Sequence, residues 1–170
     1  MFCYSGGFAL NAALGGATEV VAVDSSESAL EAGRNNAERN GLGDKIRFHR
    51  SDALQFMQAV AAEGMQFDLV VLDPPKLAPS KKALSRATTR YKRLNAAALR
   101  LVAPGGLLMT FTCSAAMTQS GGFLTMVQSA AVTAGRTVTL MRTCGAAADH
   151  VSNLCYPEGS YLTGATLYVE

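Results

Sequence analysis

The chain has 170 residues, of which 49% are hydrophobic and 16% charged, as in a folded globular protein with a sizeable core. No apolar run reaches about 18 residues, and the N-terminal "MFCYSGGF" lacks the basic and apolar regions of a signal peptide. These features predict a cytoplasmic protein without a membrane segment. The four cysteines form no CxxC pair, so we expect free thiols and no metal site.

Charge is distributed unevenly along the chain. Residues 1–73 contain ten acids and five bases, whereas residues 74–170 contain three acids and ten bases, so their net charges are −5 and +7. The basic C-terminal part indicates a polyanionic partner; a solvated face that promotes solubility is the alternative.

Short apolar runs alternate with helical patterns, which is typical of βαβ units. Strands are predicted at 19–24, 45–50, 67–73, 105–113, 136–143 and 161–170. Helices are predicted at 26–41, 52–64, 81–106 and 120–134. Ser26 is placed to cap the first of these helices and Gly41 to end it, while Pro104 and Gly105 stop the third. The sequence therefore predicts an α/β fold with a mostly parallel central sheet of about seven strands and helices on both faces.

The first strand is the short one. Only residues 1–4 precede the glycine turn "SGGF", although a longer strand is expected there. We therefore expect the chain to be a fragment of a longer protein. Within this fragment, we expect residues 1–170 to form one domain.

In such a fold, ligands bind beyond the carboxyl ends of the strands. Gly6 and Gly7 allow close approach of the backbone to a ligand, and Asp24 is placed to accept hydrogen bonds from ribose hydroxyls. Asp52 can reach an adenine amino group, although it can equally cap the helix that follows. The fingerprint G-x-G-x-x-G is absent, which favours S-adenosylmethionine over NAD as the cofactor.

The motif "DPPK" ends the fourth strand. Pro74 and Pro75 hold the chain extended, so that Asp73 can project into the site and hold the exocyclic amine of a target base. A rigid turn with an ordinary acid is the alternative.

The stretch after this motif carries seven bases within residues 76–93. Some of them recur at helical spacing, and a second face of the same helix is apolar and should pack on the sheet. Phosphate contacts on the basic face would hold RNA next to the site. The predicted RNA-binding residues are Lys76, Lys81, Lys82, Arg86, Arg90 and Arg93.

Cys113 follows the most apolar strand, in "FTCSAAM". A buried, inert thiol is the common fate of a strand cysteine. The carboxyl end of this strand should, however, adjoin that of the "DPPK" strand, so Cys113 should face the same cleft as Asp73. A thiolate that adds to carbon 6 of cytosine makes carbon 5 nucleophilic, which is covalent catalysis.

Four stretches together resemble the RlmI-type large-subunit rRNA cytosine-C5 methyltransferases, which are class I enzymes with a Rossmann-like fold. They are "FCYSGGFALNAALGGA", "VVAVDSSESAL", "FDLVVLDPPKLAPSKKAL" and "GGLLMTFTCSAAM", and "AGRTVTLMRTCGAAADHVSNLCYPEGSYLTG" resembles the C-terminal signature. The resemblance implies that Cys113 is the nucleophile and that Asp73 holds the cytosine. It implies S-adenosylmethionine as cofactor, bound by Tyr4, Ser5, Gly6, Gly7, Phe8, Asp24, Ser25, Asp52, Ala53 and Asp73.

The chain departs from that family in two respects. It has neither the N-terminal PUA domain nor the β-hairpin of the family, and "DPPK" lacks the second cysteine that many RNA cytosine methyltransferases carry there. The base that removes the C5 proton is therefore unassigned among Asp73, His150 and Glu158. An RNA methyltransferase acting on a guanine ring nitrogen and a non-catalytic RNA-binding fragment are the alternatives, and a homodimer is left open.

Overall fold

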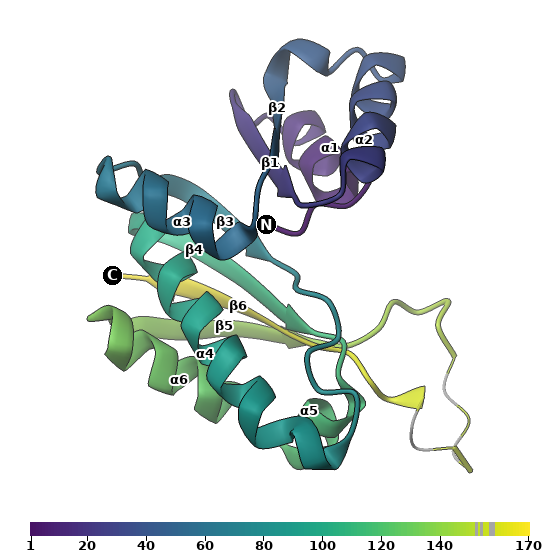
Figure 1. Cartoon of the computed structure of the whole chain (residues 1–170), viewed down its shortest axis with the longest axis vertical. Coiled ribbons are helices and arrows are strands. Elements are labelled where there is room, and N and C mark those ends of the chain that lie inside the picture. The colour runs from purple at the N-terminus through teal and green to yellow at the C-terminus, as the bar shows by residue number, and fades with distance from the viewer. Residues whose placement is uncertain (152, 154, 157–158) are drawn as a thin grey trace. The chain divides into compact units, whose positions relative to one another are not determined.

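The computed structural model describes residues 1–151, 153, 155–156 and 159–170 (Figure 1). The chain divides into two units, Met1–Ala59 and Val60–Glu170, and each has its own β-sheet. Among the described helices, none combines the length and the apolar character that crossing a membrane requires.

The first unit is built on two parallel strands, β1 (Val20–Asp24) and β2 (Ile46–Arg50), paired from Val20 and Ile46 to Asp24 and Arg50. Its helices are α1 (Gly7–Leu14), α2 (Glu27–Arg39) and the short 3₁₀ helix η1 (Gly43–Lys45). Small buried side chains of α1, α2 and β1 pack together with Leu42 and Ile46. Because the carboxyl ends of parallel strands lie at one edge, the residues after β1 and β2 are neighbours.

Helix α2 begins and ends as the sequence predicts. The Ser26 Oγ accepts a hydrogen bond from the Ala29 N–H at 3.3 Å, so Ser26 is the N-cap. Gly41 follows the C-cap residue with a φ of 65°, the left-handed conformation that glycine adopts at low cost.

The second unit contains a four-stranded sheet in the order β3-β4-β6-β5. The strands are β3 (Phe67–Leu72), β4 (Val102–Thr112), β5 (Val138–Cys144) and β6 (Thr163–Val169). β3 and β4 are parallel, whereas β6 is antiparallel to both of its neighbours. Helices α4 (Leu84–Leu101) and α6 (Phe123–Ala134) pack against each other, and α4 also contacts β3 and β4 (Figure 1).

Three shorter elements complete the described structure. α3 (Ala53–Ala62) crosses the boundary between the units in sequence, and η2 (Lys81–Ala83) leads into α4. α5 (Ala115–Ser120) follows the end of β4 directly.

The prediction of about seven mostly parallel strands in one sheet is wrong. The described residues form six strands in two sheets, and two of the four strand pairs are antiparallel. Residues 1–4 are not a strand, because Phe2 and Tyr4 have φ values of 59° and 46°, outside the β region. β6 returns along the sheet from the segment after β5, and such a return produces antiparallel pairs without a crossover helix.

Two helix predictions also need correction. The helix predicted at 120–134 begins only at Phe123, because Gly121 adopts a left-handed φ of 68° that ends a separate, unpredicted helix, α5. The helix predicted at 81–106 ends at Leu101, before Pro104, and the strand predicted at 105–113 begins at Val102. The Arg136 Nη1 donates to the Leu99 and Val102 carbonyls at 3.2 and 2.7 Å, which satisfies carbonyls at this helix end.

Candidate active site

The N-terminal turn lies beside the end of β1. The Cys3 N–H donates to the Val23 carbonyl at 3.0 Å, and the Tyr4 N–H donates to Asp24 Oδ2 at 2.9 Å. Gly6 has a φ of 86°, a backbone conformation that is strained for residues with a Cβ. This position therefore favours glycine. The turn therefore brings Tyr4 and Gly6 to the carboxyl end of β1, as the strand-end argument predicts.

The same turn is held from its other side by α2. The Asn36 Nδ2 donates to the Ser5 carbonyl at 3.1 Å. A Cβ built on Gly7 would meet no described atom within 4 Å, so the backbone of this residue is open to a ligand. Phe8 lies on the exposed side of α1, with 45% of its surface accessible.

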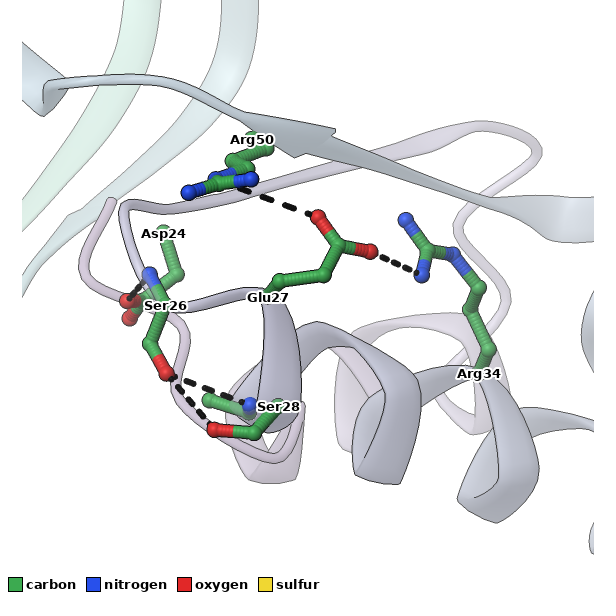
Figure 2. Close-up of polar contacts among 7 residues, drawn as sticks. Asp24, Ser26, Glu27, Ser28, Arg34 and Arg50 are labelled. Carbon is green, nitrogen blue, oxygen red and sulfur yellow. Dashed lines mark hydrogen bonds and ion pairs between the residues drawn. The ribbon is translucent and has the colours of Figure 1, made fainter.

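Asp24 has both carboxylate oxygens engaged by the backbone. Besides the bond from Tyr4, its Oδ1 accepts from the Ser26 N–H at 3.0 Å, and Figure 2 shows this contact at the start of α2. Close by, the Glu27 carboxylate forms ion pairs with Arg34 and Arg50, with nitrogen–oxygen distances of 2.9 and 4.0 Å (Figure 2). Because a carboxylate oxygen accepts more than one hydrogen bond, Asp24 is oriented and still able to accept bonds from ribose hydroxyls.

Asp52 follows β2 and is exposed. Its Oδ1 accepts from the Leu54 and Gln55 N–H groups, both at 3.0 Å, so the capping role that the sequence left open is present. The Ser51 N–H donates to the Asp24 carbonyl at 3.0 Å, which holds the two strand ends together. Ser25 is exposed and Ala53 is buried at the same edge.

In the second unit, Asp73 and Cys113 follow the adjacent parallel strands β3 and β4, whose last paired residues are Leu72 and Thr110. Both side chains are half-buried. The Cys113 Sγ lies 3.9 Å from the Pro74 carbonyl oxygen, within reach of a weak thiol hydrogen bond. The structure therefore brings the thiol close to the loop at residues 73–80, which begins with "DPPK" and is called the "DPPK" loop below.

The environment of these two groups changes their acidity. Burial raises the pKa of Asp73 above its usual value. Burial raises the pKa of Cys113 as well, the negative charge of Asp73 adds to this effect, and Lys76 opposes it. A raised pKa favours the protonated thiol, so a nucleophilic role for Cys113 would require a base that takes its proton.

All six predicted RNA-binding side chains are exposed, and they occupy one continuous segment. Lys76 lies in the loop after β3, Lys81 and Lys82 in η2, and the arginines in α4. Lys82 is thus not on the helix that carries Arg86 and Arg90, although the sequence placed it there. A pocket of about 300 Å³ adjoins this segment; it is lined by Leu77, Pro79, Ala83, Arg86, Ala87 and Arg90.

Two of the three candidate proton acceptors lie within the described residues. Asp73 is one, and His150 is exposed and meets the Tyr161 ring edge-on at 5.2 Å between ring centres. Glu158 lies outside the described residues.

Sequence reasoning missed a buried hydroxyl cluster on either side of Cys113. Thr112, Ser114 and Tyr91 have no exposed surface and hydrogen-bond to one another. The available signal was a tyrosine on the apolar face of α4 together with the hydroxyl residues that flank the cysteine. In the sequence, each of these residues resembles an ordinary core residue. Only the packing of α4 near the end of β4 shows that their hydroxyls meet.

Solved structures with a similar fold indicate the class of protein. SMU.776, a candidate methyltransferase complexed with SAH, is similar over 98% of this chain and 43% of its own, at 23% identity and a TM-score of 0.84. TrmN from Thermus thermophilus is similar over 98% of this chain and 42% of its own, at 25% identity and a TM-score of 0.64. The fold is therefore the Rossmann-like fold of methyltransferases. The family model for the methyltransferase domain matches residues 1–151, and the chain belongs to that family.

Curated relatives confirm the resemblance expected from the motifs. Ribosomal RNA large subunit methyltransferase I of Aeromonas hydrophila is 46% identical over 164 residues, which are 96% of this chain and 41% of the relative. The protein of the same name from Photobacterium profundum is 43% identical over 170 residues, 99% of this chain and 43% of the relative. The chain spans about two-fifths of the length of the curated relatives it matches.

Proposed function

We propose that this chain is the catalytic part of an S-adenosylmethionine-dependent methyltransferase that acts on C5 of a cytosine in large-subunit rRNA. The observation that carries the proposal is the thiol of Cys113 beside the "DPPK" loop, at the carboxyl end of a strand parallel to β3. The names of the curated relatives support the rRNA substrate.

The first unit has the groups that S-adenosylmethionine requires. Asp24 is held by two backbone N–H groups and can accept the ribose hydroxyls, and the open backbone at Gly7 leaves room for the cofactor. Both hydrogen bonds from α3 go to Oδ1 of Asp52. The other carboxylate oxygen, Oδ2, can therefore accept a hydrogen bond from an adenine amino group. The SAH bound by the structural relative is consistent with this assignment. When bound, the cofactor supplies the methyl group.

The second unit supplies the covalent chemistry. The Cys113 Sγ, once deprotonated, forms a bond to C6 of the cytosine, and the electron pair of the C5–C6 double bond becomes available at C5. C5 would take the methyl group, with S-adenosylhomocysteine as the leaving group. A base then removes the C5 proton, and the electron pair of the C5–H bond restores the C5–C6 double bond as the C6–S bond breaks. In this proposal Asp73 holds the cytosine amine, and it is one of the candidates for the base.

The basic segment is suited to hold the RNA strand. Its exposed side chains can neutralise phosphates without reading the sequence, and the pocket next to Arg86 and Arg90 presents apolar side chains on which a base can pack. RNA contacts at this segment would place the target close to the "DPPK" loop, which is continuous with it in sequence.

The test is mass spectrometry of the protein incubated with S-adenosylmethionine and RNA that contains 5-fluorocytosine. Fluorine at C5 cannot leave as the proton does, so the covalent adduct persists. We expect an adduct with the wild-type protein and with Cys144→Ala, a control that removes another half-buried thiol. The adduct should disappear in Cys113→Ala.

Two results contradict this mechanism. Methylation without any adduct would favour an enzyme that acts on another atom, such as a guanine ring nitrogen; the raised pKa of Cys113 is the observation that favours that alternative. Neither cofactor binding nor methylation would leave an RNA-binding module.

A further inference from the structure

The hydroxyl of Tyr91 is the centre of a buried polar network in the second unit. Tyr91 lies on α4 with no exposed surface, and its Oη is 2.8 Å from both Ser114 Oγ and Thr112 Oγ1. The Ser114 N–H also donates to Thr112 Oγ1 at 3.2 Å. The two hydroxyl residues that flank Cys113 are thus tied to each other and to the helix.

The same hydroxyls hold the loop that follows Asp73. The Ala78 N–H donates to Ser114 Oγ at 3.1 Å, and the Leu77 N–H donates to Tyr91 Oη at 3.4 Å. Three segments distant in sequence, the "DPPK" loop, α4 and the Cys113 turn, therefore meet at two oxygen atoms.

The number of acceptor sites assigns the direction of these bonds. Tyr91 Oη already accepts from Thr112 and from the Leu77 N–H, which fills the two acceptor sites of a phenol oxygen. Tyr91 therefore donates its own proton to Ser114 Oγ, which also accepts from the Ala78 N–H. Removal of the Tyr91 hydroxyl would leave the Thr112 hydroxyl and the Leu77 N–H without this acceptor. It would also leave Ser114 Oγ without this donor.

Thr110 provides the contrast within the same strand. It is as fully buried as Thr112, yet within the described residues its hydroxyl has no hydrogen-bond partner. Buried hydroxyls on β4 are therefore not connected merely by being buried. The connected hydroxyls are those of Thr112, at the end of β4, and Ser114, just beyond the strand, on either side of Cys113.

We propose that Tyr91 is a positioning residue, which sets the Cys113 thiol and the loop bearing Asp73 in the geometry that attack on the cytosine requires. This inference rests on the proposed function for the identity of the attack. A satisfied buried network specifies one arrangement of the segments it joins, because each alternative arrangement leaves a desolvated polar group unpaired. A half-buried thiol at the end of a strand, followed by a loop, needs such support to stay in one position.

The test compares three substitutions that remove a hydroxyl with little change in shape: Tyr91→Phe, Thr112→Val and Thr110→Val. The rate of adduct formation with 5-fluorocytosine RNA is measured at saturating RNA, together with RNA affinity and the melting temperature. We expect Tyr91→Phe and Thr112→Val to slow adduct formation by about 10- to 100-fold. RNA affinity should stay within about twofold, because phosphate contacts are not altered. Thr110→Val should form the adduct at the wild-type rate.

Two results would overturn the proposal: a wild-type adduct rate in Tyr91→Phe, or an equal loss of rate in Thr110→Val, which would indicate a general effect on the core. If the wild-type protein forms no adduct, the proposed function fails, and amide hydrogen exchange at Leu77 and Ala78 tests the positioning role by itself. Faster exchange in Tyr91→Phe than in Thr110→Val supports positioning of the loop by the hydroxyl. Equal exchange rates refute it.

Discussion

The two units hold their predicted site residues by different means. In Met1–Ala59, Asp24 and Asp52 accept hydrogen bonds from nearby backbone N–H groups, most of them within a few residues. In Val60–Glu170, the turn that carries Cys113 is held by the Tyr91 hydroxyl and the Ala78 N–H, which lie 21 to 36 residues away in sequence. The difference teaches that a carboxylate for a cofactor can be oriented by local turns, whereas a nucleophile between a strand and a loop depends on long-range contacts.

The two units also differ in whether their charged side chains form ion pairs. The ion pairs on the surface of the first unit join Glu19 or Glu27 to arginines. None of the six predicted RNA-binding bases forms an ion pair within the described residues. A base that forms no ion pair can neutralise a phosphate without first losing a partner, which supports the proposed RNA contacts of the second unit.

The largest expected effect is that of removing the nucleophile. Cys113→Ser should lower the rate of methyl transfer to RNA by on the order of 10³-fold or more, because a hydroxyl cannot replace the thiolate in the covalent step. Affinity for S-adenosylmethionine, measured by calorimetry, should be unchanged, since the predicted cofactor residues other than Asp73 lie in the first unit. A loss of cofactor affinity would break the division of roles between the units.

Asp24 tests the first unit in the same way. Asp24→Ala should weaken S-adenosylmethionine binding by about 10- to 100-fold, because it removes a charged acceptor for the ribose hydroxyls. It also leaves the Tyr4 and Ser26 N–H groups without their acceptor, so the melting temperature should fall. Asp44→Ala, at an exposed acid in η1, is the control. Unchanged cofactor affinity in Asp24→Ala would contradict the assignment.

Asp52 has a capping role and a predicted cofactor role, and two substitutions separate them. Asp52→Ser keeps a good N-cap, so we expect little loss of stability but about tenfold weaker cofactor binding. Asp52→Ala should lose about 1 kcal/mol of unfolding free energy in addition. Denaturant unfolding and calorimetry measure the two effects. Full cofactor affinity in Asp52→Ser would reduce Asp52 to a cap.

The acidity of Cys113 can be moved in both directions. Asp73→Asn removes a negative charge and should lower the pKa of the thiol, whereas Lys76→Met removes a positive charge and should raise it. Below the pKa, the thiolate fraction increases about tenfold per pH unit. Alkylation of Cys113 by iodoacetamide at about pH 8 should therefore be several-fold faster in Asp73→Asn and slower in Lys76→Met, and mass spectrometry can follow it. Shifts of the same sign would show that neither charge acts on the thiol.

The smallest effect concerns single bases of the second unit. Arg86→Ala and Arg90→Ala should each weaken RNA binding a few-fold and reduce the slope of log affinity against log salt by about 0.7 to 1. Arg34→Ala is the matched control, since this arginine is paired with Glu27 in the first unit. Filter binding at several salt concentrations measures the slope. An equal change in Arg34→Ala would mean that the basic segment has no special part in RNA binding.

The sequence by itself determined the elements whose information is local. The start of α2 at Ser26, the strands at β1, β2 and β3, and the acids that follow them could all be predicted, because caps, apolar runs and strand ends are properties of short stretches. The approach of Cys113 to the "DPPK" loop could be predicted as well, since the carboxyl ends of neighbouring parallel strands share an edge.

Only the tertiary structure decided the rest. The antiparallel pairing of β6 depends on which strands it meets, and the division of the strands into two sheets depends on pairing across the whole chain. The Tyr91 network joins residues that are far apart in sequence and that each resemble ordinary core residues. Hydrogen bonds between distant segments leave no periodic trace in a sequence, because each partner is specified by the position of the others in space.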